Sequence, residues 1–228
     1  MSNPTGSMVA ARGLTRTYGT ASAPLHALDD VSLDVAPGEM LAVAGRSGSG
    51  KTTLLNLLGG LDRPDAGTVH VDGAEVTALD DDGLSTLRRD TVSYVFQTFG
   101  LIPALTAAEN VGVPLRLRRT PVAEREQRVA LLLDLVGLGD HALQRPAELS
   151  GGQQQRVAIA RALAGSPRVL LADEPTGQLD TETGVGVMAL LRAVVESEGV
   201  TAVVATHDAV LMSLADRVLA ISDGRVDG

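Results

Sequence analysis

The sequence has 228 residues, 44% of them apolar, and a net charge of −9. This length is enough for one large domain or two small ones. The acidic charge argues against a nucleic-acid partner, and the absence of cysteine excludes disulfides and thiolate metal sites. No signal peptide and no apolar run of about 18 residues is present, so we expect a soluble protein. Residues 1–8 are predicted to be a mobile lead-in to a single domain over residues 9–228.

The predicted elements alternate between strands and helices. Residues 9–35 and 68–76 have the Val/Leu content and Gly turns of antiparallel hairpins, and about 104–164 is predicted to be helical, without a strand. Short apolar runs predict buried strands, and helical periods predict two helices between them. The expected strands are Met40–Ala44, Val92–Phe96, Val169–Ala172, Ala202–Ala205 and Val218–Ile221, and the expected helices are Gly50–Leu58 and Thr181–Ser197. This order predicts an α/β fold with a mostly parallel sheet, a β subdomain and a helical subdomain.

The loop after Met40–Ala44 fits the phosphate-binding pattern GxxxxGK[ST]. Its glycines let successive N–H groups point at phosphate oxygens, and the following helix N-terminus adds its dipole. The loop contains Lys51, which is the one lysine among 19 basic residues. We expect Lys51 to reach the β- and γ-phosphates of a bound nucleotide, and the Thr52 hydroxyl to coordinate Mg²⁺. The candidate nucleotide-binding residues here are Gly45, Arg46, Ser47, Gly48, Ser49, Gly50, Lys51, Thr52 and Thr53.

Two carboxylates follow the strand Val169–Ala172. An exposed acidic loop after a strand would give the same pattern, but beside a phosphate-binding loop each carboxylate has a task. We expect Asp173 to hold Mg²⁺ and Glu174 to orient the attacking water. The sequence therefore favours nucleotide hydrolysis.

A second glycine-rich segment, Leu149–Arg156, begins a predicted helix. Ser150 is a good N-cap, and the glycines permit close approach of an anion, although a well-capped helix alone would explain both. This segment resembles the LSGGQ signature of ABC (ATP-binding cassette) ATPases. The resemblance implies a P-loop nucleotide-hydrolase (RecA-like) core and a head-to-tail dimer. In that dimer Ser150, Gly151, Gly152 and Gln153 contact the ATP held by the opposite copy of the chain.

Other positions match the same family one by one, from about Val9 to Val226. Gln97 resembles the glutamine that senses Mg²⁺ and couples to the membrane partner, and His207 resembles the γ-phosphate sensor. Asp180 resembles the D-loop aspartate, although Gln178 departs from the usual Asn or Ala. Tyr18 resembles the aromatic residue that stacks on adenine; a surface tyrosine before Gly19 is the alternative. The implied catalytic residues are Glu174, His207 and Lys51, and the implied metal ligands are Thr52, Gln97 and Asp173.

The segments Leu54–Asp62 and Phe96–Pro103 resemble the group that includes lipoprotein-releasing and macrolide-exporting ATPases. This placement implies a peripheral protein on the cytoplasmic face of the membrane, which powers a permease. Because the sequence stops shortly after Asp223, we expect the permease on a separate chain. The apolar loop residues Phe99, Leu101, Ile102 and Leu105 are either a coupling surface or packing for the helical region. An importer ATPase, a non-transport ABC ATPase and a regulatory module without turnover are the rival functions.

Overall fold

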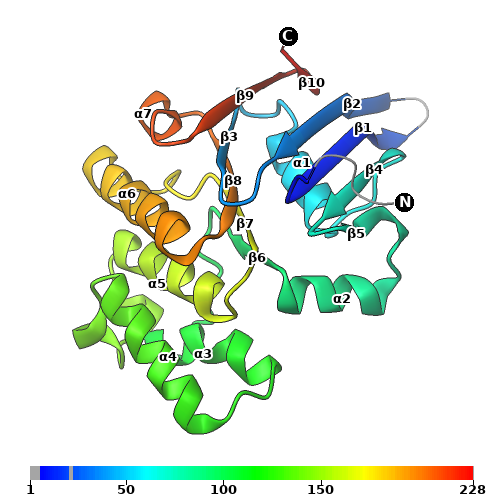
Figure 1. The fold of residues 1–228 in the computed structure, drawn as a ribbon. Helices are drawn as coiled ribbons and strands as arrows, with labels where there is room; N and C mark the ends of the chain where they lie inside the picture. The colour runs from blue at the N-terminus through cyan, green and yellow to red at the C-terminus, as the bar shows by residue number, and fades with distance from the viewer. Residues whose placement is uncertain (1–5, 21–22, 228) are drawn as a thin grey trace.

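The computed structural model describes residues 6–20 and 23–227 (Figure 1). Part of the predicted lead-in, residues 1–5, lies outside the described residues. Met8 is buried, and its N–H donates to the Val35 carbonyl 2.8 Å away, so the ordered sheet region reaches at least to Met8.

A central six-stranded sheet has the strand order β10-β9-β3-β8-β7-β6, and its neighbours are parallel except β10 and β9. Every residue of β3 and β8 is buried, because helices and the second sheet cover both faces of the central sheet. The mostly parallel α/β architecture expected from the sequence is confirmed. The strands are β3 (Met40–Ala44), β6 (Val92–Val95), β7 (Val169–Asp173), β8 (Thr201–Thr206), β9 (Arg217–Ser222) and β10 (Arg225–Val226).

The predicted hairpins form a separate antiparallel sheet with the order β2-β1-β4-β5. In the long hairpin of β1 and β2, Val9 pairs with Val35 and Tyr18 pairs with Leu25. The other neighbour of β1 is β4, whose pairing extends only as far as Thr15 with Ala66. The last residues of β1 therefore have a strand on one side only. The elements are β1 (Val9–Thr20), β2 (Ala23–Val35), β4 (Ala66–Val71) and β5 (Ala74–Glu75).

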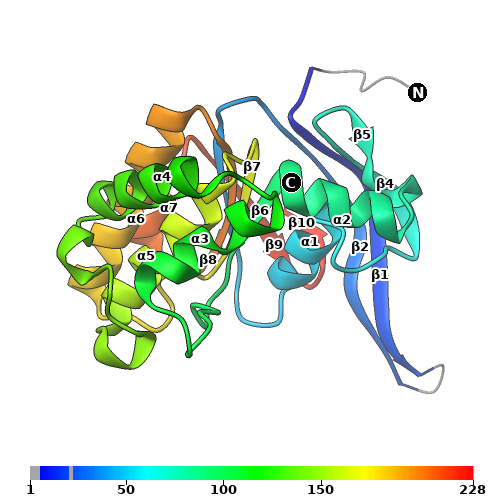
Figure 2. The ribbon, with the colours of Figure 1, turned by 90° about the horizontal axis from the view of Figure 1, so that it is seen from below.

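Between β6 and β7 the described chain contains helices and no strand. A capping box of Thr106 and Glu109 begins α3, and a capping box of Ser150 and Gln153 begins α5. Figure 2 shows this helical region on one side of the molecule and the antiparallel sheet on the other, with the central strands between them. The helices are α3 (Ala107–Leu117), α4 (Val122–Leu135) and α5 (Gly151–Ala164).

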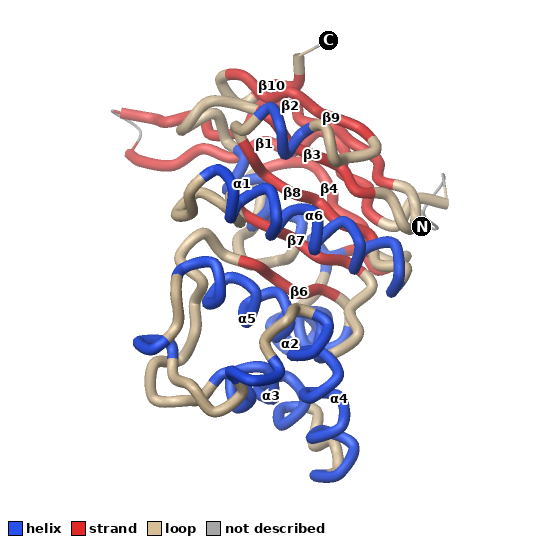
Figure 3. Tube along the Cα trace, turned by 90° about the vertical axis from the view of Figure 1, so that its left-hand side faces the viewer, coloured by secondary structure: helices blue, strands red, loops and turns tan. Residues whose placement is uncertain are grey.

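Alternate residues of the central strands face two different apolar cores. Val43 and Val203 face the core shared with helix α1 (Lys51–Leu58) and the antiparallel sheet. Ala172 and Val204 face the core shared with α3, α4, α5 and helix α6 (Thr181–Glu198). Figure 3 shows α6 lying beside the central strands. The central sheet thus joins both halves of the molecule.

Two helices and one strand were not predicted from the sequence. Helix α2 (Asp81–Asp90) begins at Asp80, whose side chain accepts a hydrogen bond from the Gly83 N–H, and α7 (Ala209–Met212) is a single turn. Strand β10 adds two residues to the sheet edge. Within residues 6–20 and 23–227, no helix has both the length and the apolar character needed to cross a bilayer.

Candidate active site

The phosphate-binding loop connects β3 to α1 and is closed on itself by Lys51. The Lys51 side chain is only 5% exposed, and its Nζ donates to the carbonyls of Gly45 at 2.7 Å and Arg46 at 3.0 Å. Gly50 precedes α1 with φ +106°, and a Cβ on it would lie 2.3 Å from the Ala27 carbonyl oxygen. This position therefore accepts only glycine. The loop and the N-terminus of α1 together present backbone N–H groups and a buried ammonium to an anion.

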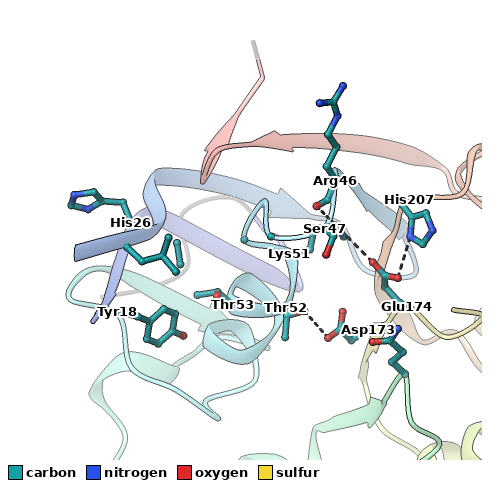
Figure 4. A pocket seen from close by; sticks show the side chains of 15 residues that line it. Tyr18, His26, Arg46, Ser47, Lys51, Thr52, Thr53, Asp173, Glu174 and His207 are labelled. Atoms are coloured by element: carbon teal, nitrogen blue, oxygen red, sulfur yellow. Dashed lines mark hydrogen bonds and ion pairs between the residues drawn. The ribbon is translucent and has the colours of Figure 1, made fainter. Parts of the chain in front are cut away.

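A cavity of about 730 Å³ opens over this loop and receives side chains from five separate parts of the chain (Figure 4). Tyr18 and His26 come from the long hairpin, Gln97 from the loop after β6, and the acidic pair from the end of β7. His207 comes from the loop after β8. The predicted residues that line the cavity are Tyr18, Arg46, Ser47, Gly48, Gly50, Lys51, Thr52, Thr53, Gln97, Asp173, Glu174 and His207. Because β3, β7 and β8 are parallel, their carboxyl ends meet at this edge of the sheet.

Glu174 contacts two other residues that line the cavity, Lys51 and His207 (Figure 4). Its Oε1 lies 3.5 Å from Lys51 Nζ, and its Oε2 lies 3.1 Å from His207 Nδ1. The backbone of Glu174 has φ +43°, which is uncommon for a residue with a side chain, and its N–H donates to the Ala205 carbonyl at 3.0 Å. A strained backbone at such a residue is typical of functional sites.

Asp173 and Thr52 form an oxygen-rich pair beside Glu174. The Thr52 hydroxyl donates to Asp173 Oδ2 at 2.8 Å, while the buried Asp173 Oδ1 has no hydrogen-bond partner among the described residues. Burial raises the pKa of Asp173; the Thr52 hydrogen bond opposes this shift, and the Glu174 charge adds to it. A carboxylate oxygen without a partner, beside a hydroxyl, suits a hard cation such as Mg²⁺.

The described residues contain no cluster of three His, Cys, Asp or Glu side chains able to hold a metal ion. Mg²⁺ is usually bound in proteins by one or two side chains together with phosphate oxygens and water. Thr52, Asp173 and the amide of Gln97 fit that kind of site, since all three line the same cavity.

The structure does not bring the signature segment to this cavity. Ser150 caps α5 by accepting from the Gln153 N–H at 3.3 Å, and Gln153 Nε2 lies 2.9 Å from His141 Nε2. Asp180 is the N-cap of α6 and lines a neighbouring cavity of about 150 Å³, which also includes Glu174 and His207. Of the remaining predicted residues, Gly45 and Ser49 belong to the phosphate-binding loop without lining the cavity, and Gly151 and Gly152 start α5.

Of the apolar loop residues after Gln97, some pack against the protein core and others are exposed to solvent. Leu101 packs against the core of the helical region, while Ile102 is 41% exposed. Arg161 on α5 donates to the carbonyls of Phe99 and Gly100, at 3.1 and 2.6 Å. No local sequence pattern pointed to this link between α5 and the loop, or to the hydrogen bond between Tyr18 and Asp62.

The fold and the site define a P-loop nucleotide hydrolase with a helical insertion between two strands of its core. The family model described as ABC transporter matches residues 28–177, and the chain belongs to that family. It is an ATP-binding cassette, a class of ATP hydrolase, as the resemblance in the sequence implied.

Curated relatives include both exporter and importer ATPases. The chain is 47% identical over 213 residues to the macrolide export ATP-binding/permease protein MacB of Brucella melitensis biotype 1, covering 93% of this chain and 33% of that protein. It is 46% identical over 220 residues to the methionine import ATP-binding protein MetN of Brucella abortus, covering 96% of this chain and 58% of that protein. The chain thus spans about a third of the length of the exporter and over half that of the importer.

Solved structures with the same fold extend over nearly the whole chain. The ATP-binding cassette MJ0796, in a dimeric post-hydrolysis state bound to ADP and Pi, gives a TM-score of 0.89 at 44% identity, with 97% of each chain covered. The structure of cbiO1 from Clostridium perfringens, part of the transporter complex cbiONQ, gives a TM-score of 0.88 at 29% identity, covering 98% of this chain and 88% of that one.

Proposed function

We propose that this cassette hydrolyses ATP as a head-to-tail dimer at the cytoplasmic face of the membrane and powers a membrane permease. One observation carries the proposal. The phosphate-binding loop and the acidic pair share one cavity, while the glycine-rich start of α5 lies outside it. A second copy of the chain can supply that segment to the open side of the cavity. The dimeric state of MJ0796 supports this arrangement.

In the proposed reaction, the loop N–H groups and Lys51 bind the phosphates of ATP, and Tyr18 stacks on the base. Glu174 orients a water molecule in line with the γ-phosphorus, and the bridging P–O bond breaks to release ADP and inorganic phosphate. Lys51 and His207 stabilise the charge that spreads over the γ-phosphoryl oxygens. Mg²⁺, held by Thr52, Asp173 and Gln97, would neutralise charge on the β- and γ-oxygens.

The composite site is tested by the dependence of hydrolysis on protein concentration. If each site needs two copies of the chain, phosphate release per chain rises with concentration and levels off when the dimer is saturated. A Ser150→Arg variant, which blocks the start of α5, is expected to abolish this rise while ADP binding persists. A rate per chain that is independent of concentration down to the nanomolar range, in a protein shown to be monomeric there, would contradict the dimer.

We further propose that the permease belongs to the export or force-transmitting type. The segments Leu54–Asp62 and Phe96–Pro103 support this type, as does the 47% identity to MacB. An importer is the second candidate, favoured by the 46% identity to MetN. In either case we propose that the exposed Ile102, rather than the packed Leu101, meets the permease.

A pull-down from solubilised membranes of the native host distinguishes these two types. The bait is the Glu174→Gln chain with ATP and Mg²⁺, and the bound proteins are identified by mass spectrometry. A permease with few membrane-spanning helices and a large external domain would support export or force transmission. A permease with many helices and a solute-binding protein would establish an importer, and ribosomes or DNA would overturn the transport function.

A further inference from the structure

Two side chains that do not line the nucleotide cavity, those of Arg16 and Asp62, contact Tyr18. Its hydroxyl donates to Oδ2 of Asp62 at 2.7 Å. Asp62 lies 44 residues further along the chain, in the loop after α1. Tyr18 lines the cavity, whereas neither Asp62 nor Arg16 is among the lining residues. Their contact with the lining of the cavity is therefore the one that each makes with Tyr18.

Arg16 covers one face of the Tyr18 ring. The two residues are separated by one position on β1, so their side chains project from the same face of the strand. The guanidinium carbon of Arg16 lies 4.7 Å from the ring centroid, in a cation–π arrangement. A planar base can then stack only on the opposite face of the ring.

The same guanidinium is fixed by two carboxylates. Nε and Nη2 of Arg16 donate to the two oxygens of Asp62 at 3.0 and 2.9 Å, which is a bidentate pair. Nη1 donates to Asp65 at 2.9 Å, and the other Asp65 oxygen accepts from the Thr17 N–H at 2.7 Å. Asp62 joins the ring and the guanidinium into one network, which fixes the position of both.

The network also explains how an aromatic ring keeps its orientation near the end of a hairpin. Beyond Thr15, β1 has lost its partner β4, so the sheet supports Tyr18 only through Leu25 on β2. The side chains of Arg16 and Asp62 are 23% and 26% exposed, so this ion pair is partly shielded from solvent. Although burial opposes the shift, hydrogen bonds from Tyr18 and the Arg63 N–H and the Arg16 charge lower the pKa of Asp62. Asp62 therefore stays ionised at neutral pH.

We propose that Arg16 and Asp62 are positioning residues that hold the Tyr18 ring as a one-sided stacking platform for the nucleotide base. This inference rests on the proposed ATP-binding function, and specifically on Tyr18 as the base-stacking residue. A platform that is ordered before the nucleotide arrives reduces the conformational entropy lost on binding. Its contribution is confined to the base, because the phosphates are held by the loop around Lys51.

The test compares a ligand that has a base with one that lacks it. Dissociation constants of ADP and inorganic pyrophosphate are measured with Mg²⁺ by isothermal titration calorimetry, on the full chain and on its Asp62→Ala and Arg16→Met variants. We expect both variants to bind ADP about threefold to tenfold more weakly, a loss of part of a stacking contact, while pyrophosphate affinity stays within about twofold. Asp62→Asn keeps an oxygen acceptor for the Tyr18 hydroxyl but loses one of the two acceptors for Arg16, and is therefore expected to recover part of the ADP affinity lost in Asp62→Ala.

A matched control is Asp34→Ala, which removes the carboxylate partner of Arg12 on the same hairpin and is expected to change neither constant. Equal weakening of both ligands in Asp62→Ala and Asp62→Asn, or no weakening of ADP in Asp62→Ala and Arg16→Met, would overturn the proposal. Tyr18→Ala separates this from a failure of the proposed site. If Tyr18→Ala weakens ADP and Asp62→Ala does not, only the positioning role is wrong; if Tyr18→Ala has no effect, the base-stacking role itself is wrong.

Discussion

His207 Nδ1 lies 3.1 Å from Oε2 of Glu174, so the carboxylate expected to orient water is in contact with the histidine expected to sense the γ-phosphate. The two residues follow neighbouring parallel strands, β7 and β8, which register Asp173 against Ala205. The other Glu174 oxygen faces Lys51 at 3.5 Å. One carboxylate is thus in contact with both of the groups that we propose to stabilise the γ-phosphoryl charge, so in the proposed mechanism nucleotide binding would affect how Glu174 orients the attacking water.

Replacing His207 by alanine removes one of the two groups that orient Glu174. We expect the turnover number for phosphate release to fall by about 100-fold, the loss typical of one preorganised group in a transition state, while ADP affinity changes less than about threefold. His70→Ala is the control, since His70 pairs with Glu75 on the antiparallel sheet, away from the cavity. A parallel loss of ADP affinity would show that His207 acts mainly in binding.

Gly177 lies against the side chains of Gln97 and Glu174. A Cβ at this position would be 3.0 Å from Gln97 Nε2 and 3.4 Å from Glu174 Oε2. Gly177→Ala is therefore expected to displace the Gln97 amide and lower phosphate release by about tenfold. The melting temperature should change little, because a flexible side chain can move aside. Gly186→Ala on α6, where the nearest atom is 3.9 Å away, is the control and should keep wild-type activity.

Asp173 is expected to destabilise the fold when no cation is bound. Its pKa is raised by burial, so the folded chain holds the proton more tightly than the unfolded chain. Stability therefore falls as the pH rises from the ordinary pKa of an aspartate toward the raised value. In EDTA at neutral pH, Asp173→Asn should raise the melting temperature by about 2–4 °C, while hydrolysis is lost. Across a pH series, the same variant should lose less stability than the wild-type chain as the pH rises. A lower melting temperature for Asp173→Asn would contradict the account.

Arg161 fixes the loop that follows Gln97. It donates to the carbonyls of Phe99 and Gly100, both in the left-handed region, and burial lowers its pKa. Arg161→Met keeps most of the aliphatic stem but loses both hydrogen bonds. We expect a loss of about 2 kcal/mol, which is a drop of about 4–8 °C in melting temperature. Arg225→Met, which breaks an exposed pair with Asp29, should cost less than about 1 kcal/mol.

The buried strands and the phosphate-binding loop were predictable because local patterns determine them. Strands β3 and β8 are apolar at nearly every position, because both faces of the sheet are covered. The glycines of the loop are required by the local backbone conformation, as the positive φ of Gly50 shows. Helix α2 was missed because only Leu84 and Leu87 of its ten residues are buried, which leaves a weak apolar period. Its Asp80 N-cap was the signal that could have located it.

The contacts that join distant segments could not be predicted from local pattern. Arg16 and Asp62 are 46 residues apart, and Arg161 is 61 residues from Gly100. Such pairs depend on how the two sheets and the helical region pack, which no spacing rule in the chain encodes. The distance of Ser150 from the cavity likewise depends on how the helical region packs. It was expected only because the family resemblance implied a site shared between two copies of the chain.

The most direct test of the central claim is the mass of the Glu174→Gln chain in solution with and without MgATP. By size-exclusion chromatography with light scattering, we predict a shift from 23.5 kDa to twice that value on adding MgATP, because ATP binds between two copies and is not hydrolysed. Adding Ser150→Arg should abolish the shift while the variant still binds ATP. A chain that is saturated with MgATP and remains at 23.5 kDa, or one that hydrolyses ATP at the wild-type rate, would contradict the account.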